Sequence, residues 1–261
     1  FAFLVAGHWL KGTYGEDRKN IGKTIKLFFE TFKNMKNPPA MVLKTGSDGS
    51  ITEQEELIEK INAIRNMVTG TLPPLYLVSG NLSDTEMNQL YRDPKIKAMV
   101  SFTKGEGFGR PLAEFSLTKK PIIVSNWSGH TDFIKPEFAV LLGGELKNIH
   151  DSAAWKDVLM KEAKWFNVDE EVAMNAMKDV HKNYKDYIKK SRKARQYIKD
   201  NFSYEKMKEK LSEILEENVK IEAQLNLPNM EAPKLQLPKL KKIGENKTEL
   251  PKLKLPKLKK V

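Results

Sequence analysis

Two glutamates separated by eight positions flank a glycine-rich segment in the middle of the chain. The segment reads Glu106-Gly107-Phe108-Gly109-Arg110-Pro111-Leu112-Ala113-Glu114. Glycines let a backbone approach a ligand closely, and the free N–H groups of a helix that begins near Pro111 favour an anion. Carboxylates bind sugar or ribose hydroxyls through strong hydrogen bonds. The segment therefore predicts a site for a phosphate-bearing or polyhydroxylated ligand, although it is also typical of an ordinary turn between a strand and a helix.

The elements that would hold this segment alternate between strand-length apolar runs and amphipathic helices. The expected strands cover residues 1–6, 40–45, 74–79, 97–102, 121–125 and 138–142. Ser83-Asp84-Thr85-Glu86 has the form of a capping box, which begins a helix. The alternation predicts an α/β fold with a doubly wound, Rossmann-like parallel sheet and helices on both faces. Ligands bind such a sheet beyond the carboxyl ends of its strands, and the segment from Glu106 to Glu114 follows one of those ends.

The rest of the chain changes character twice. No strand pattern is evident after Gly143-Gly144, and apolar residues three and four apart predict helices over residues 151–224. From residue 225 onward Leu-Pro-Lys recurs, and the frequent prolines exclude a long helix, which predicts an extended, disordered tail. We therefore divide the chain into a Rossmann-like domain over 1–150, C-terminal helices over 151–224 and a basic tail over 225–261.

Composition excludes some kinds of site and suggests others. The net charge is +11, and residues 231–261 carry ten lysines against three glutamates, so the tail either docks on an acidic partner or stays solvated. The absence of cysteine excludes disulfides and thiolate metal ligands. The four histidines show no ligand-like spacing, so no metal site is expected. No apolar run has the length of a transmembrane segment and no signal peptide is evident, which predicts a cytoplasmic protein.

The segment from Glu106 to Glu114 resembles the E-x7-E signature of the family-four (group 1) retaining glycosyltransferases. Further pieces follow in that family's order: Val5-Ala6-Gly7, Arg18-Lys19-Asn20-Ile21, Tyr76-Leu77-Val78-Ser79-Gly80, Lys120-Pro121-Ile122-Ile123-Val124, Ser128-Gly129-His130-Thr131-Asp132 and Asn201-Phe202-Ser203-Tyr204. The resemblance covers residues 1–216. It implies the C-terminal, donor-binding half of a two-domain GT-B fold. Because Phe1 already lies in a predicted strand, an N-terminal acceptor domain is expected upstream.

The resemblance also implies an activity and roles for individual residues. A hexose would pass from a nucleotide-diphosphate sugar, of UDP or GDP type, to an unknown acceptor with retention of configuration and without a cofactor or metal. Glu106 and Lys19 would be the catalytic residues: Glu106 orients the sugar, and Lys19 neutralises the departing diphosphate. Glu114 would hold the ribose hydroxyls. The substrate-binding residues that the resemblance implies are Gly7, Arg18, Gly107, Phe108, Gly109, Arg110, Glu114 and His130.

Several positions depart from that family's pattern. His8 stands where arginine is frequent, Arg110 replaces a leucine, and Asp132 replaces a glutamate. Lys11 competes with Lys19 for the phosphate-binding role, and we favour Lys19 because it directly precedes a predicted helix.

Two other hypotheses about the function of the chain compete with a glycosyltransferase. The chain could be a non-catalytic binding module whose Leu-Pro-Lys tail docks on nucleic acid or on an acidic protein. A dinucleotide-dependent oxidoreductase has less support, because the turn from Gly7 to Gly12 lacks the Gly-x-Gly-x-x-Gly pattern. Trp127, beside the Ser128–Asp132 turn, either packs against the protein or stacks on a ligand.

Overall fold

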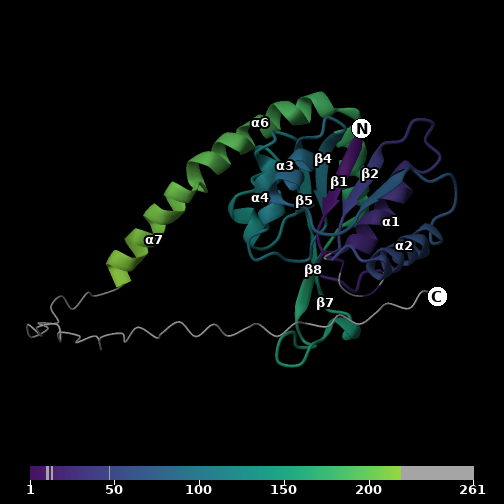
Figure 1. Cartoon of the computed structure of the whole chain (residues 1–261), viewed down its shortest axis with the longest axis horizontal. Coiled ribbons are helices and arrows are strands. Elements are labelled where there is room, and N and C mark those ends of the chain that lie inside the picture. The colour runs from purple at the N-terminus through teal and green to yellow at the C-terminus, as the bar shows by residue number, and fades with distance from the viewer. Residues whose placement is uncertain (10–11, 13, 47, 219–261) are drawn as a thin grey trace, which may run out of the picture. The chain divides into compact units, whose positions relative to one another are not determined.

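A computed structural model describes residues 1–9, 12, 14–46 and 48–218 and builds them into a six-stranded sheet, a two-stranded sheet and flanking helices (Figure 1). The larger sheet is parallel throughout, in the order β3-β2-β1-β4-β5-β6. Its strands are β1 (Ala2–Ala6), β2 (Ala40–Lys44), β3 (Leu75–Val78), β4 (Ile96–Ser101), β5 (Ile122–Ser125) and β6 (Val140–Leu142). All six expected strands are present. The order reverses between β1 and β4, which confirms the predicted doubly wound, Rossmann-like fold.

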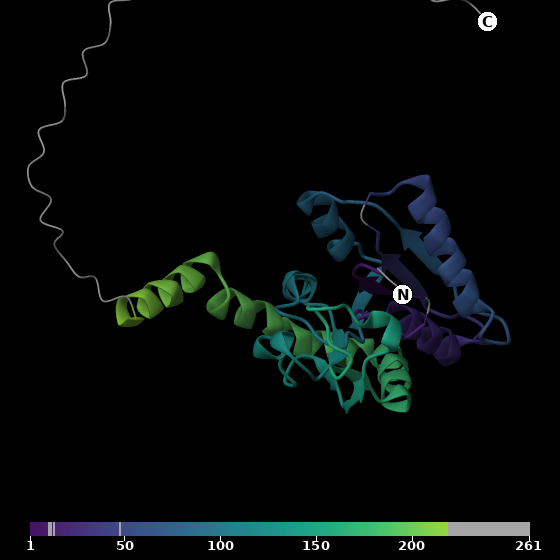
Figure 2. The ribbon, with the colours of Figure 1, turned by 90° about the horizontal axis from the view of Figure 1, so that it is seen from below.

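Helices cover both faces of this sheet because its central strands present apolar side chains in both directions. In β1, Phe3 and Val5 belong to one buried cluster and Ala2 and Leu4 to the other. The first cluster includes side chains of α1 (Ile21–Phe32), α2 (Ile51–Arg65) and α5 (Glu170–Lys182). The second includes side chains of α3 (Asp84–Arg92), α4 (Arg110–Ser116) and α6 (Tyr184–Asn201). Figure 2 shows α2, in blue, on the opposite side of the strands from α3.

Local sequence explains where two of these helices begin and end. The capping box before α3 is confirmed: the Glu86 amide donates to Ser83 Oγ at 3.3 Å, and the Ser83 amide donates to the Glu86 carboxylate at 2.8 Å. Helix α1 ends at Phe32, although Met35 continues its apolar residues at helical spacing. The backbone leaves the helix at Lys33, which has ψ 147°, and Asn34 follows in a left-handed conformation and accepts a hydrogen bond from the Thr71 amide.

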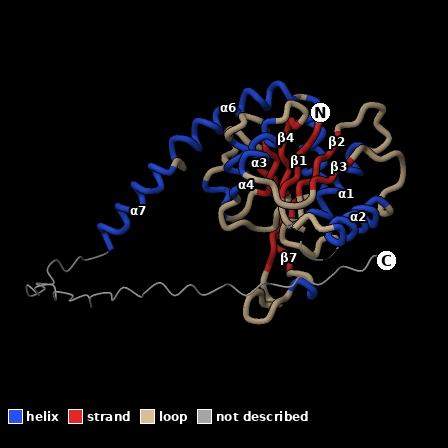
Figure 3. Tube along the Cα trace, in the orientation of Figure 1, coloured by secondary structure: helices blue, strands red, loops and turns tan. Residues whose placement is uncertain are grey.

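The prediction of helices over residues 154–168 is wrong, although a short 3₁₀ helix covers Asp151–Ala153. Strand β7 (Gly144–Asn148) pairs antiparallel with β8 (Lys164–Val168), and both lie beyond the carboxyl edge of the larger sheet (Figure 3). Phe166 and Val168 alternate inward into the core. This period-two pattern is hard to recognise because it lasts only five residues and includes a lysine and an asparagine.

Helices follow this hairpin as expected: α5, α6 and α7 (Tyr204–Asn218). No helix in the described part of the chain is long and apolar enough to cross a membrane. The predicted tail over residues 225–261 lies outside the described residues, and the division of the chain into three parts stays a prediction.

Candidate functional site

Glu106 lies in the loop after β4 and contacts two cations from the loop after β1. Its Oε1 lies 2.6 Å from Lys19 Nζ, and its Oε2 lies 3.1 Å from Arg18 Nη1. Arg18 also donates to the Gly105 carbonyl. The two loops meet because β1 and β4 are neighbours at the point where the strand order reverses. The structure thus brings together three residues that the sequence analysis assigned to one site.

The Glu106 carboxylate is buried and depends on its cations. Its side chain is only 8% exposed. Burial acts to raise the pKa of Glu106, but the hydrogen bond and charge of Lys19, with contributions from Thr103 and Arg18, hold the pKa below its ordinary value. Lys19 has three N–H donors, so it can keep this contact and still bind a phosphate oxygen.

The Ser128–Asp132 turn supports the backbone of Glu106. The Glu106 amide donates to Ser128 Oγ at 2.7 Å, and the Gly129 amide donates to the Glu106 carbonyl at 3.0 Å. Ser128 has φ 73° and ψ −164°, a conformation that is essentially restricted to glycine. The serine therefore occupies a strained position in which its hydroxyl fixes the Glu106 loop.

Replacing Ser128 by glycine removes both the backbone strain and the hydrogen bond to Glu106. Relief of the backbone strain contributes about 1 to 3 kcal/mol, and loss of the hydrogen bond to Glu106 costs about 1 kcal/mol. We expect Ser128→Gly to unfold at an equal or higher urea concentration than the wild type, although the Glu106 loop loses a hydrogen bond. A clear loss of stability would show that the strain is not released.

His130 lies beneath the glycine loop. It is fully buried, and its Nε2 lies 2.6 Å from the Ser125 carbonyl, so Nε2 carries the proton. Burial lowers the pKa of His130, which keeps the ring neutral at pH 7. Its Cβ lies 3.3 Å from the position that a Cβ on Gly109 would occupy. His130 does not line the cavity described below, and its predicted contact with substrate stays a prediction.

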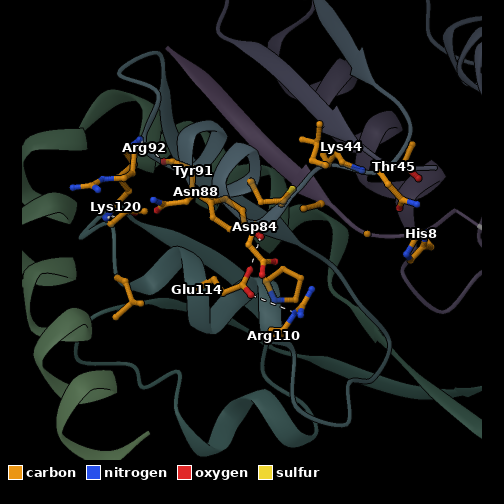
Figure 4. A pocket seen from close by; sticks show the side chains of 18 of the residues that line it. His8, Lys44, Thr45, Asp84, Asn88, Tyr91, Arg92, Arg110, Glu114 and Lys120 are labelled. Carbon is orange, nitrogen blue, oxygen red and sulfur yellow. Dashed lines mark hydrogen bonds and ion pairs between the residues drawn. The ribbon is translucent and has the colours of Figure 1, made fainter. Parts of the chain in front are cut away.

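Glu114 lines a cavity of about 940 Å³ at the carboxyl edge of the sheet (Figure 4). Its Oε2 accepts a hydrogen bond from the Tyr91 hydroxyl at 3.1 Å, and its Oε1 lies 3.3 Å from Arg110 Nε. Burial, followed by the charge of Glu114, raises the pKa of Tyr91. One turn of helix separates Arg110 from Glu114, which explains why the two face the same space.

The predicted residues divide between this cavity and its surroundings. Gly7, Arg18, Lys19, Arg110 and Glu114 line the cavity. Glu106 and Gly109 line a small recess that shares Lys19 with it. Phe108 instead packs against Phe133, with ring centroids 4.7 Å apart. Gly107 lines neither the cavity nor the recess.

The sequence analysis left the roles of three further residues open. His8 lines the cavity. Trp127 stacks on Phe166 of the β7–β8 hairpin, with ring centroids 5.8 Å apart, which favours packing over contact with a ligand. Lys11 lies outside the described residues, so the structure does not compare it with Lys19.

The sequence analysis missed most of the cavity's positive charge. Asp84 and Glu114 are the acidic residues that line the cavity in the described chain. The lining cations are Arg18, Lys19, Lys44, Arg92, Arg110, Lys119, Lys120 and Arg195. Lys44 ends an apolar strand and donates to the Gly80 carbonyl at 2.6 Å, and burial lowers its pKa. A lysine at the carboxyl end of a buried strand was a signal that could have identified it.

Lys104 connects three segments around the site. Its Nζ donates to the Gly15 carbonyl and lies 4.7 Å from the centroid of Trp165 on β8. Its amide donates to the Arg18 carbonyl at 2.9 Å. Burial lowers the pKa of Lys104 to about 8, although Asp17 opposes the shift. A single buried lysine thus links the loop that carries Glu106 to the loop that carries Arg18 and to the hairpin.

Replacing Lys104 by methionine tests this buried charge. In the folded protein the lysine releases its proton near pH 8, below its ordinary pKa of 10.5, so stability rises with pH between these values by up to about 1.4 kcal/mol per pH unit. Lys104→Met lacks this contribution. Urea unfolding at increasing pH should show a flatter dependence for Lys104→Met than for the wild type or for Lys95→Met, which removes an exposed lysine. Equal slopes in all three proteins would contradict the assignment.

The chain matches no family model, and no curated protein sequence matches it. Solved structures share its fold. HepE of Anabaena, solved with UDP and glucose, is 13% identical with a TM-score of 0.53, over 82% of this chain and 48% of HepE. A glycosyltransferase of Rickettsia africae is 17% identical with a TM-score of 0.55, over 83% of this chain and 47% of that chain. This chain therefore spans less than half the length of these two proteins.

A third solved structure covers a single domain. The C-terminal domain of LpcC, a group 1 family glycosyl transferase of Francisella tularensis, is 13% identical with a TM-score of 0.52, over 77% of this chain and 86% of that domain. At these identities the similarity establishes the fold alone. The chain has the fold of one half of a GT-B glycosyltransferase.

Proposed function

We propose that this chain is the nucleotide-sugar-binding domain of a retaining glycosyltransferase that transfers a hexose from a UDP- or GDP-type donor. One observation carries the proposal: Lys19 lies at the switch point of the sheet, in contact with Glu106 and on the wall of the basic cavity that also holds Glu114. HepE supports a nucleotide-sugar ligand, because it has the same fold and was solved with UDP and with UDP-glucose. The acceptor would bind to an N-terminal domain.

The chemistry follows from where charge develops. When the sugar leaves its donor, the nucleotide departs as a diphosphate, and negative charge grows on the phosphate oxygens. Lys19 and Arg18 are already held by Glu106 and Gly105, so they stabilise that charge without first reorganising. Glu106 would then accept hydrogen bonds from the sugar hydroxyls, and its own loop is fixed by Ser128.

Glu114 would bind the ribose of the same ligand. Its carboxylate keeps acceptor capacity beyond its contacts with Tyr91 and Arg110, and it is partly open to the cavity. Tyr91 holds the carboxylate in place, which reduces the ordering that binding would otherwise cost.

Calorimetric titration of the full chain with UDP and GDP tests the proposal. We expect binding in the micromolar to millimolar range, and Glu114→Gln should weaken it about ten-fold or more because charged hydrogen bonds to the ribose become neutral. Glu145→Gln is the matched control, since Glu145 is an exposed glutamate of β7 that does not line the cavity. Absence of binding to both nucleotides, or equal weakening by the two variants, would contradict the proposal.

A further inference from the structure

The cavity that contains Glu114 continues along helix α3 to a second group of cations. Asp84 and Arg92, the first and last residues of α3, both line it and lie about 12 Å apart along the helix axis. In the view of Figure 4, Asp84 is drawn near Glu114, and Arg92 and Lys120 are drawn near each other on the far side of Tyr91. Lys119, which precedes Lys120 in the chain, also lines the cavity. Arg195 of α6 also lines the cavity.

Asp93 follows Arg92 in the chain and attracts Lys120, but it does not line the cavity, and the lining cations here outnumber this one carboxylate. The acidic residues in the described lining are Asp84 and Glu114, and Glu114 is already paired with Arg110 and holds a hydrogen bond from Tyr91, the neighbour of Arg92. Within the described chain, the side chains of Arg92, Lys119 and Arg195 make no ion pair or hydrogen bond. They come from three different segments, so their presence in one cavity lining does not follow from a single charged helix face.

Lys120 differs from these three because it is anchored. Its Nζ donates to the Tyr91 carbonyl at 2.7 Å and to the Asp93 carbonyl at 2.8 Å, which satisfies the carboxyl end of α3. Burial lowers the pKa of Lys120 to about 8, with the attraction of Asp93 opposing the shift and the repulsion of Lys97 adding to it. Two of its three N–H donors are used, and the third is left for a ligand.

We propose that Arg92, Lys119, Lys120 and Arg195 form a second phosphate-binding site, separate from the contacts of Lys19 and Arg18 with a donor diphosphate. Arginine presents several N–H groups in a planar fork that matches phosphate oxygens, and lysine adds a compact charge. The ligand is a phosphate group, either free or carried as a monoester. The inference does not depend on the proposed transferase activity, because none of these four cations is among the residues assigned to the donor.

Nuclear magnetic resonance of the ¹⁵N-labelled full chain locates such a site directly. Inorganic phosphate should shift the backbone amide signals of Arg92, Lys119 and Lys120 in a saturable way. The variant Arg92→Gln/Arg195→Gln should weaken this binding about ten-fold or more. The control variant Lys95→Gln/Arg192→Gln removes two exposed cations that do not line the cavity and should leave the affinity nearly unchanged.

A second titration with glucose 6-phosphate distinguishes the source of the phosphate group. Tighter binding than that of inorganic phosphate would assign the site to a monoester, and equal binding would assign it to free phosphate. Absence of saturable shifts at these three residues, or equal weakening by both double variants, would overturn the proposal.

The same experiment separates this site from the donor site. Lys19→Met removes a cation of the donor site and should leave the shifts at Arg92 intact. Phosphate binding that is lost in Lys19→Met would show that the donor site alone binds phosphate and would also overturn the proposal.

Discussion

Lys19→Met should lower the free energy of unfolding by about 3 kcal/mol, because it leaves the buried Glu106 carboxylate without its nearer partner. The same change should weaken nucleotide binding about thirty-fold, the loss of one charge-assisted hydrogen bond to phosphate. Lys19 is 20% exposed and Glu106 is 8% exposed, so water replaces the lost partner poorly. Urea unfolding and calorimetric titration with UDP or GDP measure the two effects.

Two further variants show whether the effect arises from the buried charge. Arg18→Met removes the other partner of Glu106. Arg18 is 47% exposed and lies farther from the carboxylate than Lys19 does, so its loss should lower the free energy of unfolding by no more than about 1 kcal/mol. Adding Glu106→Gln to Lys19→Met removes the buried carboxylate that has lost its contact with Lys19. The double variant should regain most of the stability, but not nucleotide binding. If the double variant is as unstable as Lys19→Met, the cost comes from packing rather than from charge.

Lowering the pH should remove the stability that the ion pair between Lys19 and Glu106 contributes. The pKa of Glu106 is lower in the folded protein than its ordinary value, so the ion pair contributes stability above the ordinary carboxyl pKa, and this contribution is lost as pH falls through the folded value. Lys19→Met should therefore lose less stability on acidification than the wild type does.

Gly129→Ala should be the most damaging single-atom addition in the site. A Cβ on Gly129 would lie 1.8 Å from the Gly107 carbonyl oxygen, which is backbone and cannot move without displacing the loop that carries Glu106. We expect a loss of about 3 kcal/mol in unfolding free energy, together with the loss of nucleotide binding.

Gly107→Ala is the matched control for this change. It adds the same methyl group to the same loop, but nothing lies within 4 Å of the added Cβ, and Gly107 does not have a positive φ. Its stability should stay close to that of the wild type. Similar losses in Gly129→Ala and Gly107→Ala would mean that the contact between the two turns does not hold the loop.

Much of the fold could be predicted from the sequence because strand length and apolar composition coincide. The buried strands of a parallel sheet are apolar on both faces, and runs such as residues 97–102 are therefore conspicuous. The β7–β8 hairpin was missed because its inward residues, Phe166 and Val168, become meaningful only once the core they enter is known.

The candidate site was predictable where residue type and local order carried the signal. The loop from Glu106 to Glu114 and the cations Arg18 and Lys19 belong to this group. Lys104 and Lys120 were not predictable, because in sequence they look like ordinary solvated lysines. Their burial and hydrogen bonds to backbone carbonyls arise from segments that are distant in the chain, and only the folded structure brings these together.

A crystal structure of the full chain with UDP or GDP tests the central claim most directly. We predict the diphosphate at Lys19 and Arg18, and a ribose hydroxyl within about 2.7 Å of a Glu114 carboxylate oxygen. A nucleotide bound elsewhere on the molecule, with Glu114 and Lys19 making no contact with it, would contradict the assignment of this cavity to a nucleotide-sugar donor.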